Sequence, residues 1–289
     1  MASFSKVKCL AVLLFHNDED LVEDQINYYG NINEHELIVF NHNSSDKTSE
    51  LIAVNKDKIN CIYDLSDKIV FRTNEVHSTI YKILLGRQDY NKKEVKLSDQ
   101  RFKNFKYSAE YDWISFPESD EFLEGPNRSL SYYEHLCNIS PDKSISRIVF
   151  DNIIYWFTEK DDPRIQSPIE RIKYYSYKSD CALRLYAWRG HATTADVFFG
   201  HPRSCCATGP RWKTRHYEMR SRDHLVEKVN RYISVNPTLR GANTHYRIMH
   251  DRLLADPAFG DIPSTQLHYD DGVEEICMVE KYDWNRNVY

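Results

Sequence analysis

The sequence is poor in glycine. Only nine of its 289 residues are glycine, less than half of the roughly 7% that is usual. This scarcity disfavours collagen-like repeats, flexible linkers and the glycine-rich loops that cradle phosphate groups. A phosphate site in this chain must therefore be built from other groups.

The sequence also lacks an excess of positive charge. Its 38 Lys and Arg residues are outnumbered by 43 Asp and Glu residues, which gives a formal net charge of −5. A broad basic surface is absent, so no nucleic-acid partner is expected. An anionic ligand would have to meet a local cluster, and residues 203–222 carry one. Its Arg211, Arg215 and Arg220 have the forked guanidinium groups that suit a diphosphate.

Paired cysteines and long apolar runs are missing as well. The seven cysteines include no CxxC pair, a pattern typical of reduced, buried thiols in a cytoplasmic protein. The apolar run 9–15 is followed by acidic residues rather than by a cleavage site. It is also far shorter than the roughly 18 residues of a membrane span. We therefore expect a buried first strand.

Hydrophobic patterns in the first 65 residues alternate between strand and helix. Strands are predicted at 7–15, 36–40 and 59–63, and helices at 21–29 and 48–54. Such alternation indicates an α/β protein with a mostly parallel sheet flanked by helices. Further strands are expected at 112–116, 146–157 and 182–188, and further helices at 98–110, 129–137, 221–232 and 243–254. We predict one domain over 1–232, with a helical extension, 233–289, packed on it.

Carboxylates cluster directly after one of the predicted strands. Residues 113–123 read WISFPESDEFL, which places Glu118 and Asp120 two residues apart at a strand end. Ligands of open α/β sheets bind outside the carboxyl ends of strands. Oxygen ligands at this spacing suit Mg²⁺ or Mn²⁺. The alternative is a solvated acidic turn.

A short polar segment follows the second strand. Residues 41–48 read NHNSSDKT, and their side chains are of the kind that hydrogen-bond a base or a ribose. The alternative is a turn that caps the next helix, with Ser45 or Asp46 as the N-cap. Both interpretations can hold together.

These segments resemble the family 2-type glycosyltransferases of the GT-A fold. Members commonly have an N-E-like turn after the first strand, a D-N-x-S-x-D-x-T-like segment after the second, and a D-x-D-E-F-L metal motif. Here the three read Asn17-Asp18, NHNSSDKT and ESDEFL. A subgroup also carries H-Y-x-x-[RK]-S, which is HYEMRS at 216–221. Asn41 and Glu118 stand where the family usually has Asp.

The resemblance implies a function and a set of roles. It implies a metal-assisted, inverting glycosyltransferase of the hexosyltransferase type that takes a nucleotide-diphosphate sugar, with a UDP-sugar favoured. The acceptor would be the hydroxyl of a glycan or of a lipid-linked saccharide, the latter with peripheral membrane contact. Glu118, Asp120 and His216 would hold Mn²⁺ or Mg²⁺, with His201 as a competitor for the third position. Nucleotide contacts would come from Asn17, Asp18, Asn41, Ser44 and Asp46, and diphosphate contacts from Arg211, Arg215 and Arg220.

The catalytic base and the protein class have alternatives. An inverting transfer needs a carboxylate base, for which Asp196 and Asp151 rank ahead of Glu218 and Glu121. Rival classes are a nucleotidyltransferase-like enzyme and a non-catalytic carbohydrate-binding protein of the same fold. A zinc site is a further rival, built from His191, His201, Cys205, Cys206 and His216.

Overall fold

The computed structural model describes residues 6–66, 73–84, 92–93, 95–100, 110–145, 147–177, 184–189, 212–235, 251 and 263–272. Strands and helices alternate in the first part of the chain, as predicted. The elements are β1 (Cys9–Phe15), α1 (Val22–Ile26), η1 (Asn27–Ile32), β2 (Glu36–His42), α2 (Thr48–Val54), η2 (Lys56–Lys58) and β3 (Cys61–Leu65).

Later elements are mainly strands. They are α3 (Thr73–Leu84), β4 (Val95–Gln100), β5 (Trp113–Ser115), β6 (Glu121–Glu124), α4 (Tyr132–Ile139), β7 (Arg147–Trp156), α5 (Pro168–Arg171), β8 (Tyr174–Tyr177), β9 (Arg184–Arg189), β10 (Trp212–Met219), α7 (Arg222–Val235), η3 (Ser264–Gln266) and β11 (His268–Tyr269). The helix predicted at 98–110 is wrong at 98–100, which belong to β4, and 101–109 lie outside the described residues. Of the predicted helix 243–254, the structure describes only residue 251.

The protein is α/β, and its sheet is mixed. Strands β3, β2, β1 and β5 are adjacent and parallel. Beyond them, β4 is antiparallel to β3, and β9 is antiparallel to both β5 and β7. The parallel arrangement expected from the sequence therefore holds for the half formed by β3, β2, β1 and β5 and, in the described part of the other half, for the pair β7 and β10. In the other half, β7 is followed by β8 with only the four-residue helix α5 between them, and without a long crossover the strands pair antiparallel.

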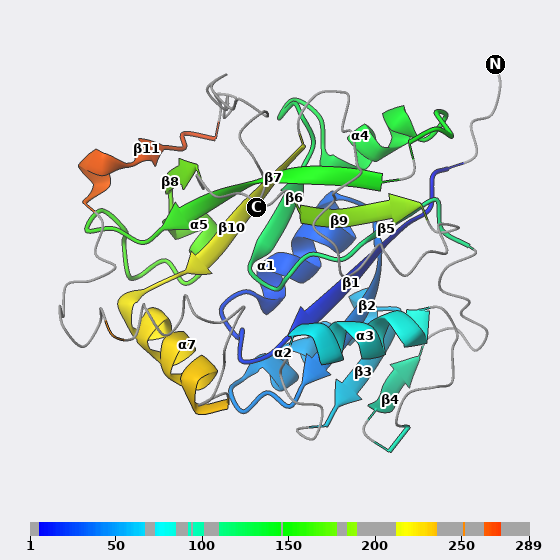
Figure 1. Cartoon of the computed structure of the whole chain (residues 1–289), viewed down its shortest axis with the longest axis horizontal. Coiled ribbons are helices and arrows are strands. Elements are labelled where there is room, and N and C mark those ends of the chain that lie inside the picture. The colour runs from blue at the N-terminus through cyan, green and yellow to red at the C-terminus, as the bar shows by residue number, and fades with distance from the viewer. Residues whose placement is uncertain are drawn as a thin grey trace.

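The parallel half is buried on both faces, which explains its continuous apolar runs. Successive side chains of a strand point to opposite faces. In β1, Ala11 and Leu13 belong to one hydrophobic cluster with residues of α1 and α4, whereas Leu10 and Val12 pack with residues of α3 on the other face. Figure 1 shows α3 lying across the strands of this half on the side towards the viewer.

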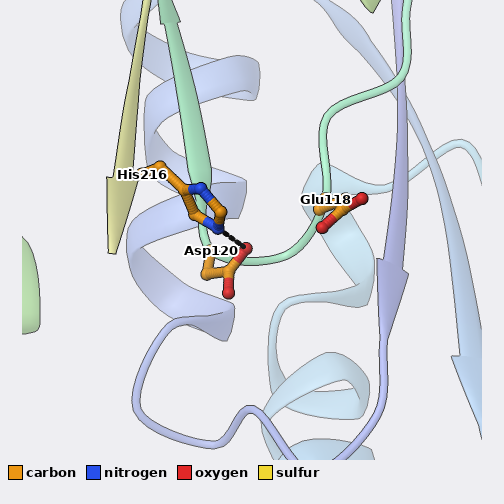
Figure 2. A group of neighbouring side chains, drawn as sticks. All are labelled: Glu118, Asp120 and His216. Atoms are coloured by element: carbon orange, nitrogen blue, oxygen red, sulfur yellow. Dashed lines mark ion pairs between the residues drawn. The ribbon is translucent and has the colours of Figure 1, made fainter. Parts of the chain in front are cut away.

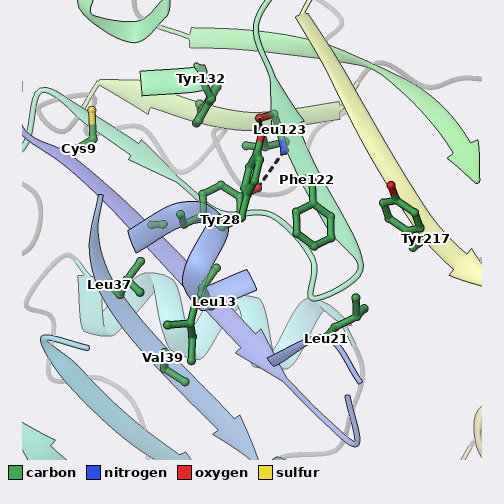
Figure 3. Packing of buried hydrophobic residues seen from close by; sticks show 14 of the residues in the cluster. Cys9, Leu13, Leu21, Tyr28, Leu37, Val39, Phe122, Leu123, Tyr132 and Tyr217 are labelled. Atoms are coloured by element: carbon green, nitrogen blue, oxygen red, sulfur yellow. Dashed lines mark hydrogen bonds between the residues drawn. The ribbon is translucent and has the colours of Figure 1, made fainter. Parts of the chain in front are cut away.

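Strand β6 is fixed to the helical layer by tyrosines (Figure 3). The Tyr28 hydroxyl donates to the Leu123 carbonyl over 2.6 Å, and the Tyr29 hydroxyl accepts from the Leu123 N–H over 3.0 Å. The Phe122 ring packs edge-on between the rings of Tyr28 and Tyr217. These contacts hold β6 in place directly after the carboxylates of the candidate site.

A late segment of the chain joins the same sheet. Strand β11 pairs with β8, and the buried Asp270 beside it accepts two hydrogen bonds from Arg128, of 2.6 and 2.9 Å, and one from the Tyr155 hydroxyl. The division into 1–232 and 233–289 stays a prediction. No helix in the described part of the chain has the length and apolar composition to cross a bilayer.

Candidate metal and nucleotide site

Three loops meet at one edge of the parallel half. They follow β1, β2 and β5, whose carboxyl ends lie at the same edge because the strands are parallel. The loops hold residues 16–21, 43–47 and 116–120. Most of the residues singled out in the sequence lie in or beside these loops.

Glu118, Asp120 and His216 come together at this edge (Figure 2). One ligand atom from each lies within 4.8 Å of the others. The first two belong to the turn between β5 and β6. His216 lies on β10, which pairs antiparallel with β6 so that His216 stands opposite Glu121. Asp120 and His216 are buried, and Glu118 is half-buried.

Hydrogen bonds fix the carboxylate turn from several sides. The Glu118 N–H donates to the Glu121 carboxylate over 2.9 Å, and the Glu121 N–H donates to the Glu118 carbonyl over 3.0 Å. The buried Gln25 amide of α1 donates to the Ser119 and Glu121 carbonyls, each over 2.8 Å. Tyr217 of β10 donates its N–H to the Asp120 carbonyl over 2.8 Å. The two carboxylates are therefore presented by a rigid backbone, as a binding site requires.

Asp120 is flanked by positive partners. Its Oδ1 lies 3.3 Å from His216 Nε2, and its Oδ2 lies 3.0 Å from Lys228 Nζ. Burial opposes the charge of Asp120, but Lys228 and His216 outweigh it and hold its pKa well below the usual range. Burial likewise opposes the charge of His216, yet Asp120 and Glu121 raise the pKa of this imidazole above its ordinary value. Asn152 contacts the other ring nitrogen, Nδ1, over 3.2 Å.

The loops after β1 and β2 are locked to each other. Both oxygens of Asp46 accept backbone N–H groups, from Glu19 over 3.1 Å and from Thr48 over 2.9 Å. Asn17, with a positive φ of 57°, donates its N–H to Ser44 Oγ over 3.2 Å. Asp46 thus organises the loop before α2, which begins at Thr48, and neither Asp46 nor Ser45 is its N-cap.

Asn41 lies near the end of β2, and the nitrogen of its side-chain amide is hydrogen-bonded. Its Nδ2 donates to Ser49 Oγ over 3.0 Å and to Asp64 Oδ1 over 3.1 Å. Its Oδ1 is buried and meets no hydrogen-bond partner in the part of the chain that the structure describes. A buried acceptor without a partner costs about 1–3 kcal/mol, so this oxygen is suited to a donor from a ligand.

The predicted diphosphate residues Arg215 and Arg220 are paired with carboxylates. Arg220 is buried, with Nη2 at 3.2 Å from Asp18 Oδ1 and Nε at 2.7 Å from Asp20 Oδ2. Arg215 Nε lies 2.7 Å from Glu124 Oε1. The guanidinium of Arg215 also lies over the rings of Tyr28 and Phe122, 5.7 Å from each centroid. Asp18, predicted to contact the nucleotide, thus pairs with Arg220, and its nucleotide contact stays a prediction.

The structure places one predicted residue, Asp151, apart from the trio, and several others lie outside the described residues. Asp151 of β7 is buried and in register with Lys213. Asn152 contacts His216, so alternation along β7 puts Asp151 on the opposite face. Asp196 and Arg211 lie outside the described residues, as do His191, His201, Cys205 and Cys206. Their roles stay predictions.

Sequence reasoning missed Lys228, Gln25 and Asn152. Lys228 carried a signal in helical periodicity: it follows Leu225 by three residues and precedes Val229, and both of these are buried. Gln25 and Asn152 carried none, because their partners belong to segments distant in the sequence.

Comparisons with known proteins found likeness only among solved structures. No protein-family model matches the chain, and no curated protein matches it in sequence. TarS 1-349 of S. aureus in complex with UDP-GlcNAc is 13% identical at a TM-score of 0.30, over 53% of this chain and 35% of that one. TarS 1-349 in complex with UDP is 10% identical at a TM-score of 0.38, over 87% of this chain and 73% of that one. Full TarS is 10% identical at 0.37, and this chain covers 44% of its length. A likeness at such TM-scores carries no argument about function. A functional proposal therefore depends on the side chains of the site.

Proposed function

We propose that this protein is a glycosyltransferase that uses a divalent metal ion and a nucleotide-diphosphate sugar. The observation that carries the proposal is the convergence of Glu118, Asp120 and His216 at the carboxyl edge of the parallel strands. Two carboxylates on a rigid turn and the imidazole of His216 on β10 fit Mn²⁺ or Mg²⁺. When bound, such an ion would offset the negative charge of a departing nucleoside diphosphate.

The neighbouring loops supply a place for the nucleoside. Asn41 presents a buried acceptor, Oδ1, at the end of β2. Asn17 and Ser44 keep the adjoining loops in one arrangement, so little conformational entropy is lost on binding. We infer that the base lies over the ends of β1 and β2 and that the diphosphate points towards Asp120. Transfer with inversion to a glycan or lipid-linked hydroxyl belongs to the same proposal, with Asp196 as the expected base.

The test is a thermal-shift and calorimetric titration with UDP and UDP-sugars, with and without Mn²⁺. A ligand that binds only the native state raises the melting temperature. We expect a UDP-dependent shift that needs Mn²⁺ and that is lost in Asp120→Asn and weakened in Glu118→Gln. The matched control is Asp162→Asn, which removes a carboxylate that pairs with the exposed Arg164. Hydrolysis of the bound UDP-sugar then separates an enzyme from a carbohydrate-binding protein.

Two results would count against the proposal. One is that no nucleotide sugar binds the native protein. The other is that Asp120→Asn binds UDP with Mn²⁺ as tightly as the unmodified protein does. Binding of nucleoside triphosphates in place of nucleotide sugars would support the nucleotidyltransferase alternative.

A further inference from the structure

Lys228 occupies an unexpected place in the candidate metal site. Its Nζ lies 3.0 Å from Asp120 Oδ2 and 3.2 Å from the Glu218 carbonyl, and its side chain is 11% exposed. The other oxygen of Asp120 faces His216. Asp120, the buried carboxylate of the candidate metal site, is therefore already paired with cationic groups of the protein.

An ammonium and a divalent cation compete for such a carboxylate. Two positive charges bound to the same carboxylate repel each other, and the repulsion is strong in a buried site where water is scarce. Withdrawal of Lys228 from Asp120 would relieve this repulsion when a metal ion binds there. Its ammonium ends a flexible four-carbon stem, so withdrawal needs no movement of α7.

The surroundings favour a polyanion as the next partner of Lys228. Arg220 lies just before α7, and Arg231, one turn after Lys228, donates to the His16 carbonyl over 3.2 Å. His224 lies among these groups: burial and then the charges of Arg220 and Lys228 lower its pKa to about 2, so it is neutral. Helix α7 thus places two cationic side chains, Lys228 and Arg231, beside the site, and a diphosphate held at Asp120 would meet Lys228.

We propose that Lys228 changes partner when the donor binds: its ammonium neutralises Asp120 in the empty protein and pairs with the donor diphosphate once a divalent cation takes Asp120. This inference rests on the function proposed above. It assigns to Lys228 two successive tasks at one site, protecting a buried carboxylate and then binding the leaving group.

The first experiment measures Mn²⁺ affinity without nucleotide, by calorimetry or by the electron paramagnetic resonance signal of free Mn²⁺. Lys228→Gln removes the competing charge, so we expect its Mn²⁺ affinity to rise about tenfold. Lys56→Gln removes the same charge from the exposed helix η2 and should leave the affinity within about twofold. Lys228→Arg keeps the charge and should bind Mn²⁺ like the unmodified protein.

The second experiment measures UDP affinity at saturating Mn²⁺. Here Lys228→Gln loses a charged hydrogen bond to the diphosphate, and we expect UDP binding to weaken about tenfold. Lys228→Arg should retain UDP affinity within about threefold. Opposite effects of one substitution on the two ligands are the signature of partner exchange, because a merely destabilised site would lose affinity for both.

The inference is overturned if Lys228→Gln binds Mn²⁺ no more tightly than the unmodified protein, or if its UDP affinity is unchanged. In either case Mn²⁺-dependent UDP binding by the unmodified protein leaves the proposed function standing. If the unmodified protein itself binds neither Mn²⁺ nor UDP, the proposed function fails and this inference fails with it.

Discussion

Replacing Arg220 by Met should show how firmly the two halves of the sheet are tied together. Arg220 follows β10 and forms ion pairs with Asp18 and Asp20, which follow β1, about 200 residues earlier. Burial opposes its charge, but Asp20 and Asp18 raise the pKa of this guanidinium above its ordinary value. Met fills a similar volume without charge, so the substitution leaves two carboxylates without their cation.

The size of the effect follows from the exposure of each partner. The side chain of Arg220 is 2% exposed and that of Asp18 is 9% exposed, whereas that of Asp20 is 35% exposed. Removing one partner of a fully buried pair costs about 3–5 kcal/mol, and solvent screens part of the loss at Asp20. We therefore expect Arg220→Met to lower the free energy of unfolding by about 2–4 kcal/mol.

The matched control is Arg164→Met. Arg164 pairs with Asp162 at distances of 2.7–3.1 Å, as short as those of Arg220, but its side chain is 88% exposed. Exposed pairs contribute about 0–1 kcal/mol, so this variant should unfold in urea almost like the unmodified protein. The reasoning is refuted if both variants lose the same stability, or if Arg220→Met loses less than about 1 kcal/mol.

Two further substitutions test local features of the fold. Burial raises the pKa of Asp24 to about 6, although its hydrogen bond from Ser167 acts in the opposite direction. Because the folded protein then holds this proton more tightly than the unfolded chain does, its stability falls as the pH rises from about 4 through 6. Asp24→Asn should therefore stabilise the protein by about 1–2 kcal/mol at pH 8, after allowance for solvent screening, and not at pH 4, which urea unfolding at both pH values checks. A Cβ at Gly125 would lie 1.9 Å from the His135 ring, whose Nε2 contacts the Asn127 carbonyl at 2.7 Å, whereas one at Gly30 meets the flexible end of Leu37 at 3.0 Å. Gly125→Ala should lower the melting temperature and cost about 1–3 kcal/mol, and Gly30→Ala should cost less; the reverse order would contradict the packing argument.

The parallel half was predictable because its signals are local. Strand β1 is an unbroken apolar run since both of its faces are buried, and β2 reads the same way. Boundaries were less certain where a side chain decides them. Helix α4 was expected from residue 129, but it begins at Tyr132, because Ser131 and Glu134 form a capping box at its start.

The trio was predictable to different degrees. Glu118 and Asp120 share one turn, so their spacing alone brings them to one place. His216 came only from the resemblance, since nothing in its own segment reveals that β10 pairs with β6. The antiparallel order of β9 could not be read either, because pairing with β5 and β7 depends on contacts between distant segments.

Buried and half-buried carboxylates explain why Arg215 and Arg220 of the basic segment 203–222 already have partners within the protein. A carboxylate taken out of water needs a cation beside it, and this requirement acts in the folded protein before any ligand arrives. Arg215 forms an ion pair with Glu124, and Arg220 forms one with Asp18. Asp120 forms an ion pair with Lys228, which lies outside the basic segment. A count of basic residues in the sequence cannot distinguish a cation that pairs with a carboxylate of the protein from one that binds a ligand, because it does not show which carboxylates lie beside each cation. Of these three cations, Lys228 is the one that pairs with a carboxylate of the candidate metal site, Asp120. A metal ion bound to Asp120 would therefore free Lys228, and not the two arginines, to bind the diphosphate.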